Sequence, residues 1–193
     1  MINLNEVFYE ETALVLNPKS AKIKYNIVKT LSIISYVFTI IWFYMFYTFH
    51  ALSNVVFDII LFVVPTATFI LLGYFIGRFK NKFYQEFDYA FISGTVRIAK
   101  VIKSIKRKFL LEFSCYDIEK IGEYGSETCN KYEKTPGIKT QILTPNNTPA
   151  NDKDFYYIVV NINAEKNILI FECTKTFILN ILKFSQKTVL EKE

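Results

Sequence analysis

Two long apolar segments dominate the pattern of hydrophobic and polar positions along the chain. The first, Leu31 to Phe49, is nineteen residues without a charge, and the second, Val55 to Gly77, contains one acid, Asp58. A helix of the first length spans about 28 Å, close to the hydrocarbon thickness of a bilayer. Because lipid offers no hydrogen-bond partners to a backbone, such segments must be helical. The short polar break at 50–54 then predicts an antiparallel hairpin of two membrane-spanning helices.

Basic residues flank the two apolar segments and set their expected orientation. Four lysines precede the first segment and three basic residues follow the second, whereas residues 50–54 contain no lysine or arginine. The positive-inside rule therefore predicts a multi-pass protein of the plasma membrane, with its N-terminus and its C-terminus in the cytoplasm. Aromatic residues near the outer end of the first segment fit an interfacial belt. The cations are Lys19, Lys22, Lys24, Lys29, Arg78, Lys80 and Lys82, and the aromatic residues are Trp42, Tyr44 and Tyr47.

Beyond Lys82 the pattern changes to a period of two, which is typical of strands with one buried face. Phe87, Tyr89 and Phe91 alternate with polar or small residues, and Ser93-Gly94 offers a tight turn. A loop or partial helix is expected over 122–137. The expected strands, about seven in number, lie at 87–91, 96–98, 109–113, 118–121, 138–143, 155–162 and 168–171.

The chain then closes with a helical pattern. Ile178, Ile181 and Leu182 follow the i, i+3, i+4 spacing of an amphipathic helix, and Thr174 is placed to cap its N-terminus. Seven antiparallel strands and one C-terminal helix match a pleckstrin-homology-like (PH-like) open sandwich, in which the helix closes one end. The expected fold is therefore a membrane α-helical hairpin joined to a mostly-β (α+β) cytoplasmic domain.

The pattern divides the chain into three parts. Residues 1–29 form a cytoplasmic N-terminal segment, residues 30–79 the transmembrane hairpin, with helices at about 31–49 and 55–77, and residues 80–193 the PH-like domain. The stretch from Glu6 to Leu16 mixes apolar residues with acids and leaves two interpretations open. It is either a short amphipathic helix on the membrane surface, or an extra strand or cover on the cytoplasmic domain.

Five short segments of the chain form a recognisable pattern: 86–94 (EFDYAFISG), 107–108 (RK), 117–119 (DIE), 123–127 (EYGSE) and 170–172 (IFE). In these segments the sequence resembles a bacterial family of two-pass membrane proteins with a PH-like cytoplasmic domain. The resemblance covers most of the chain in the same order of hairpin, meander and closing helix, and it implies the architecture but no activity. Where the family pattern has Pro-Asn before the last helix, this sequence has Cys173-Thr174, which leaves the start of that helix open.

Composition and charge limit the classes of partner. Hydrophobic residues make up 51% of the chain and aromatic residues 17%, and the formal net charge is +5. That charge is too small for the dense basic face expected of a nucleic-acid-binding protein, so nucleic acid is not an expected partner. A mild positive charge fits a protein held close to an anionic inner leaflet, and membrane lipids are therefore expected partners.

Residues that carry catalysis are scarce. The only histidine, His50, lies in the outer loop, and no nucleophile elbow, phosphate-binding loop, zinc-protease or dinucleotide motif occurs. Cys115, Cys129 and Cys173 have the spacing of neither a disulfide framework nor a zinc site, so they are expected to be buried hydrophobic residues. We expect no cofactor, no metal and no enzyme activity.

The most suggestive soluble feature is a run of six basic residues on an expected strand-turn-strand. No acid interrupts it, and a tethered domain would bring it within reach of anionic headgroups. The bland alternative is a solvated hairpin whose charges keep a sheet edge from pairing. The candidate lipid- or partner-binding residues are Arg97, Lys100, Lys103, Lys106, Arg107 and Lys108.

Three features inside the hairpin are also candidates. Asp58 is an acid in an apolar segment, which often marks an ion path, although it lies close enough to the helix end to reach the outer interface. Gly73 and Gly77 form a small-xxx-small pair, which fits either a homo-oligomer contact or a seat for the first helix. Pro65 should kink the second helix near mid-membrane, where Thr66 and Thr68 hydroxyls can accommodate it.

Two functional hypotheses follow. The first is a non-enzymatic, membrane-anchored binding or scaffold module at the cytoplasmic face that engages a protein partner or anionic lipid, or that self-assembles into a homo-oligomer. The second is an accessory subunit or oligomeric component of a transporter or channel, since two helices cannot form a polar path alone.

Overall fold

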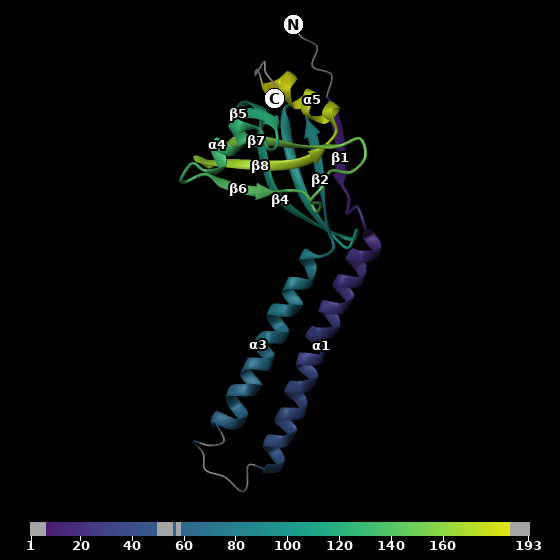
Figure 1. The fold of residues 1–193 in the computed structure, drawn as a ribbon, viewed down its shortest axis with the longest axis vertical. Helices are drawn as coiled ribbons and strands as arrows, with labels where there is room; N and C mark the ends of the chain where they lie inside the picture. The colour runs from purple at the N-terminus through teal and green to yellow at the C-terminus, as the bar shows by residue number, and fades with distance from the viewer. Residues whose placement is uncertain (1–6, 50–55, 57–58, 186–193) are drawn as a thin grey trace. The chain divides into compact units, whose positions relative to one another are not determined.

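The computed structural model describes residues 7–49, 56 and 59–185. It divides into two compact units, which we describe separately. The helical unit comprises residues 17–84, and the sheet unit comprises residues 1–16 together with residues 85–193. Helices α1 and α3 form the first unit, and the strands and helix α5 belong to the second (Figure 1).

The helical unit is a pair of antiparallel helices. Helix α1 spans Pro18–Phe49, and the returning chain forms a π-helical turn η2 (Ile59–Val63), helix α3 (Val64–Phe79) and a 3₁₀ turn η3 (Lys80–Lys82). Among the described residues, two stretches are long and apolar enough to cross a membrane, Pro18–Thr48 and Ile60–Lys82. Helix α1 thus starts well before the apolar segment. Its start is set at Asn17, whose side chain accepts the Ser20 N–H at 3.0 Å, and at Pro18, which suits the first helical position.

Small and hydroxyl-bearing residues join the two helices. Ser32 Oγ donates to the Gly73 carbonyl at 2.7 Å, and Ser35 Oγ donates to the Phe69 carbonyl at 2.8 Å. A Cβ atom on Gly73 would lie 3.0 Å from the Tyr36 ring, and one on Gly77 would lie 2.9 Å from Ser32 Oγ. Both glycines therefore face α1 within one chain.

Proline at position 65 removes the N–H that would otherwise serve the Leu61 carbonyl in an α-helix. The indole Nε1–H of Trp42 donates to that carbonyl across the helix pair at 3.1 Å. Thr66 Oγ1 donates to the Phe62 carbonyl at 2.6 Å, and the backbone here is π-helical. The indole N–H of Trp42 thus supplies the hydrogen bond that Pro65 cannot give to Leu61.

The sheet unit contains two four-stranded sheets, and the predicted open sandwich with a closing helix is confirmed. Sheet A has the order β1-β2-β3-β4 and sheet B the order β5-β7-β8-β6. Seven antiparallel strands were expected, whereas β6 pairs in parallel with β8 because a long connection returns the chain to the same end of the sheet. The strands are β1 Phe8–Ala13, β2 Gln85–Ile92, β3 Thr95–Ile102, β4 Lys106–Ser114, β5 Ile118–Glu123, β6 Lys139–Ile142, β7 Asp154–Ile162 and β8 Glu165–Cys173.

The eighth strand is β1, which comes from the N-terminal segment. It pairs antiparallel with β2, from Phe8 opposite Ile92 to Ala13 opposite Phe87. Of the two interpretations left open for this segment, the structure therefore shows the extra strand. Glu11 faces the core side of the sheet, where it accepts from the Thr174 N–H at 2.9 Å and pairs with Lys153. The whole helical unit is thus inserted in the connection between two paired strands.

The core lies between the sheets and is closed by helix α5 (Lys175–Ser185). Phe177, Ile178 and Ile181 of α5 are fully buried against Tyr89 and its neighbours. Thr174 caps the helix as predicted, since its Oγ1 accepts the Phe177 N–H at 3.4 Å. A short 3₁₀ turn, η4 (Cys115–Asp117), joins the two sheets, and helix α4 (Glu127–Glu133) covers a second apolar cluster on the other face of sheet B.

Candidate functional site

Strand register divides the six candidate basic residues between the two faces of sheet A. In the β3–β4 ladder Lys100 lies opposite Lys108, and Val101 lies opposite Arg107. Because side chains alternate along a strand, neighbouring positions point to opposite faces. The residues on the core side are Lys100, Lys106 and Lys108, those on the outer side are Arg97 and Arg107, and Lys103 lies in the connecting turn.

Both arginines are neutralised by acids on the outer face. Arg97 Nε lies 2.8 Å from Glu112 Oε2, and Arg107 Nε lies 2.9 Å from Asp88 Oδ2. Asp88 is buried and also accepts from the Thr12 hydroxyl at 2.8 Å. The guanidinium groups therefore bind the sheet's own carboxylates, and the candidate residues do not form one continuous basic patch.

The core-side lysines have different surroundings. Lys106 and Lys108 are exposed, and Lys100 Nζ lies 5.8 Å from the centre of the Phe87 ring. Like charges placed directly opposite in a ladder are destabilising.

The turn from β3 to β4 presents an apolar side chain among these cations. Ile105 is 85% exposed, more than any other large apolar side chain that the structure describes. The turn is held in shape from within, because Ser104 Oγ donates to the buried carboxylate of Glu86 at 3.0 Å. Lys103 and Ser104 both have positive φ, as expected for a tight hairpin turn. We call residues 103–106 together with Lys108 the lysine tip.

The lysine tip lies at the end of sheet A from which the chain leaves for both helices. Gln85, the first residue of β2, is paired with Ile102 next to the turn. Ala13, the last residue of β1, is paired with Phe87 at the same end. The opposite end of the sheet carries Ser114, which is paired with Thr95. Sequence reasoning found the cations but missed Ile105, because the pattern does not reveal where a turn begins.

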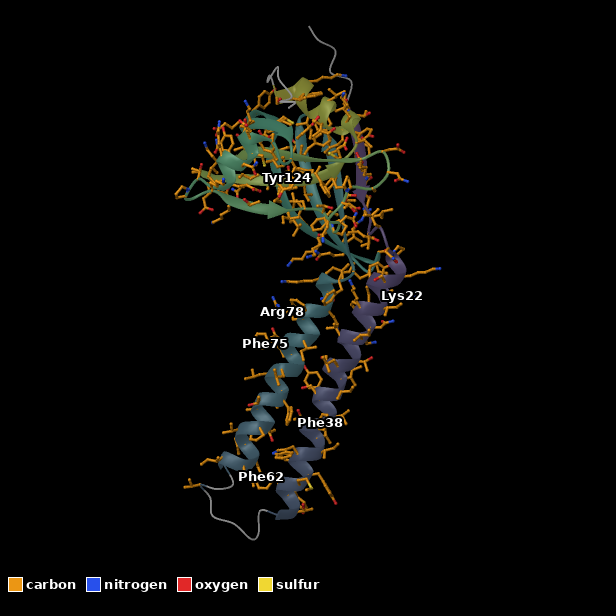
Figure 2. The ribbon with its side chains drawn as sticks, in the orientation of Figure 1. Lys22, Phe38, Phe62, Phe75, Arg78 and Tyr124 are labelled. Carbon is orange, nitrogen blue, oxygen red and sulfur yellow. The ribbon has the colours of Figure 1, made fainter. Side chains whose placement is uncertain are left out.

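A second feature is a recess of about 300 Å³ on sheet B. Its lining is apolar and aromatic, with an amide rim, and Tyr124 on its wall is labelled in Figure 2. Tyr124 contacts Phe155 edge to face, with ring centres 6.4 Å apart. The lining residues are Tyr124, Ile142, Thr144, Asn146, Asn147, Phe155 and Ile170.

A buried carboxylate supports one wall of this recess. Glu172 is completely buried, and it accepts from the Thr144 hydroxyl, from Asn146 Nδ2 at 2.9 Å and from the Ala150 N–H at 3.0 Å. The same Asn146 Nδ2 also donates to the Leu14 carbonyl at 2.7 Å, which ties this loop to the residue that follows strand β1. Glu172 therefore orders a loop rather than presenting a free acid to a substrate.

The buried thiols lack the properties of nucleophiles. Burial raises the pKa of the Cys115 thiol to about 12, and it also raises the pKa of the Cys129 and Cys173 thiols. These thiols stay protonated at neutral pH, whereas the thiolate is the reactive form. Among the residues that the structure describes, no group of three or more His, Cys, Asp or Glu could hold a metal ion. The three cysteines therefore act as packed core residues.

Of the candidates in the two apolar segments, Asp58 lies outside the described residues. Gly73 and Gly77 are occupied by contacts with α1. Two of the cations that flank the apolar segments, Lys22 and Arg78, lie toward the same end of the helical unit (Figure 2). Arg78 Nη1 donates to the Tyr74 hydroxyl at 3.2 Å.

Comparison with known proteins identifies the family. No curated protein and no solved structure matches the chain. A family model described as "Bacterial PH-like domain (DUF6106)" matches residues 5–191, which include β1, the helical unit and the sheet unit up to and beyond α5. The helical unit is thus part of the family pattern and not an addition to it. The chain belongs to the bacterial PH-like domain family DUF6106.

Proposed function

We propose that the protein is a non-enzymatic binding module that two membrane-spanning helices anchor at the cytoplasmic face of the plasma membrane. One observation carries this proposal: the helical unit is inserted between paired strands β1 and β2. The PH-like domain is therefore tethered by two chain connections at one end of sheet A. Cations precede the first apolar segment and follow the second, which supports a cytoplasmic location of the PH-like domain.

The location is tested by labelling single cysteines from each side of the membrane. The native cysteines are buried, so Tyr116→Cys, at an exposed position of the sheet unit, gives a selective label. A membrane-impermeant maleimide is expected to react in inside-out vesicles and not in right-side-out vesicles. Reaction from the outer side would contradict the proposal.

The binding role is tested by purifying the full chain from native membranes in mild detergent. A protein that copurifies in a fixed ratio, and is lost when the sheet unit is destabilised, would make the module an adaptor. Retention of anionic lipid alone would make it a lipid-binding module. Turnover of a substrate by the purified protein would contradict a non-enzymatic role.

A recess on the helical unit favours an accessory subunit as the second candidate function. Its volume is about 260 Å³, and its lining includes Phe43, Phe62 and Ala67 near the π-helical turn. A further helix of a larger membrane complex would fit there by the packing of small residues against rings. Ala67→Phe should fill the recess and abolish copurification of such a complex, whereas an unchanged complex would exclude this role.

A further inference from the structure

We propose that the lysine tip is a lipid-binding site: Ile105 enters the anionic leaflet of the membrane that holds the helices, while the exposed Lys106 and Lys108 bind its headgroups. This inference rests on the proposed function, because it requires the sheet unit to stand at the cytoplasmic face. It adds the ligand and the residues that bind it.

The first argument is the reach of the chain. Only Phe83 and Tyr84 separate the start of β2 at Gln85 from Lys82 at the end of the helical unit. Three residue steps span at most about 11 Å in an extended chain. Since Gln85 is paired with Ile102 beside the tip, the tip is held within a short distance of the expected membrane interface.

The second argument is the chemistry of the tip. An exposed apolar side chain surrounded by lysines suits the boundary between acyl chains and anionic headgroups. Sixteen successive residues, 96–111, contain no acid that would repel those headgroups. The arginines of the same hairpin are paired with Glu112 and Asp88, so the exposed Lys106 and Lys108 supply the charge.

The third argument is that hydrogen bonds order the tip before it binds. Ser104 is anchored to the buried Glu86, and the Ile105 N–H donates to the Ile102 carbonyl at 3.2 Å. An ordered turn loses little conformational entropy when it binds. The β1–β2 connection, which lies at the same end of the sheet, is occupied by the helical unit and leaves the β3–β4 turn to make this contact.

The test places an environment-sensitive fluorophore on the full chain in lipid nanodiscs. Ile105→Cys carries the label, and Tyr116→Cys, 73% exposed at the opposite end of sheet A, is the matched position. The discs contain phosphatidylcholine alone or phosphatidylcholine with phosphatidylglycerol, each with a nitroxide-bearing acyl chain as quencher. We expect quenching at position 105 and not at 116, and stronger quenching in the anionic discs.

The lysines are tested in the labelled protein by the double substitution K106Q/K108Q. At about 1 kcal/mol per lysine near an anionic surface, the equilibrium for insertion should fall about 30-fold. The control K131Q/K134Q removes the same charge from exposed positions of the α4 region and should leave quenching unchanged.

Three results would overturn the inference. They are no excess quenching at position 105, equal quenching in neutral discs, and indifference to K106Q/K108Q. Loss of a copurifying protein in K106Q/K108Q, with lipid quenching intact, would assign the lysines to an acidic protein partner and also overturn it. The proposed function is read separately from the sidedness of labelling at position 116, so the two failures are distinguishable.

Discussion

Polar side chains are accommodated differently in the two units. In the helical unit, neutral donors serve backbone carbonyls: Ser32, Ser35 and Thr66 through hydroxyls, and Trp42 through its indole N–H. In the sheet unit, buried carboxylates collect several donors each, as Glu11 and Glu172 do. A neutral donor has no charge to desolvate, so it suits a segment surrounded by lipid, whereas a buried charge persists only where several partners replace water.

The largest loss of stability is expected in the sheet unit. Glu172→Leu removes the acceptor shared by Thr144, Asn146 and the Ala150 N–H, and should lower the free energy of unfolding by about 3 kcal/mol. All three cysteines lie in this unit, so the urea dependence of their labelling measures its stability. The control is Glu165→Gln at an exposed ion pair, with an expected change within about 0.5 kcal/mol. A loss no larger than the control's would show that the network is dispensable.

A smaller loss of stability is expected at the packing contact between α1 and α3. Gly73→Leu drives a side chain against the Tyr36 ring and should destabilise the helix pair by about 2 kcal/mol. Trp42 is the only tryptophan of the chain, so its fluorescence during titration with a denaturing detergent reports on this unit. Tyr36→Ala in the same chain should recover part of the loss. If it recovers nothing, the glycine is not packed against that ring.

The hydrogen bond from Trp42 to the Leu61 carbonyl, beside Pro65, should contribute still less to stability. Trp42→Phe keeps an aromatic ring, though a smaller one, and removes the N–H donated to the Leu61 carbonyl, at an expected cost of about 1 kcal/mol. In a Pro65→Ala background the restored N–H of residue 65 serves that carbonyl, so the same substitution should cost less. Helix content during detergent titration measures all four proteins of this cycle. Equal costs in both backgrounds would contradict the assigned role.

The smallest effect is expected at the exposed pair of Arg97 and Glu112. Arg97→Gln should cost about 0.5 kcal/mol by thiol labelling, and the cost should shrink at high salt. Glu112→Gln, alone and combined with Arg97→Gln, isolates the pairwise energy. A coupling above about 1 kcal/mol would mean that the outer face of sheet A behaves as a buried site.

Much of the fold follows from periodicity. The change from continuous apolar segments to period two separates the helices from β2, and Thr174 marks the start of α5. The sequence left two interpretations of residues 6–16 because Glu11 faces the core. An acid at a core-facing position breaks the alternation that identifies a half-buried strand. Its partners Lys153 and Thr174 are more than a hundred residues away in the chain, so no local pattern reveals them.

The candidate site was predictable in composition but not in arrangement. Six cations on one hairpin are visible in the sequence, yet their division between two faces depends on the irregular register at Ile98 and Ala99. One extra residue in β4 exchanges the faces of everything beyond it. The parallel pairing of β6 was equally hidden, because the direction of a four-residue strand depends on a long connection and not on its own residues.

The pairing of β1 with β2 has a consequence for biosynthesis. Residues 8–13 leave the ribosome before either helix, and their partner strand follows only after both helices have been made. If one helix alone crossed the bilayer, the two strands would end on opposite sides and sheet A would lack an edge. Sheet A can therefore be completed only where the chain between the two strands crosses a membrane an even number of times.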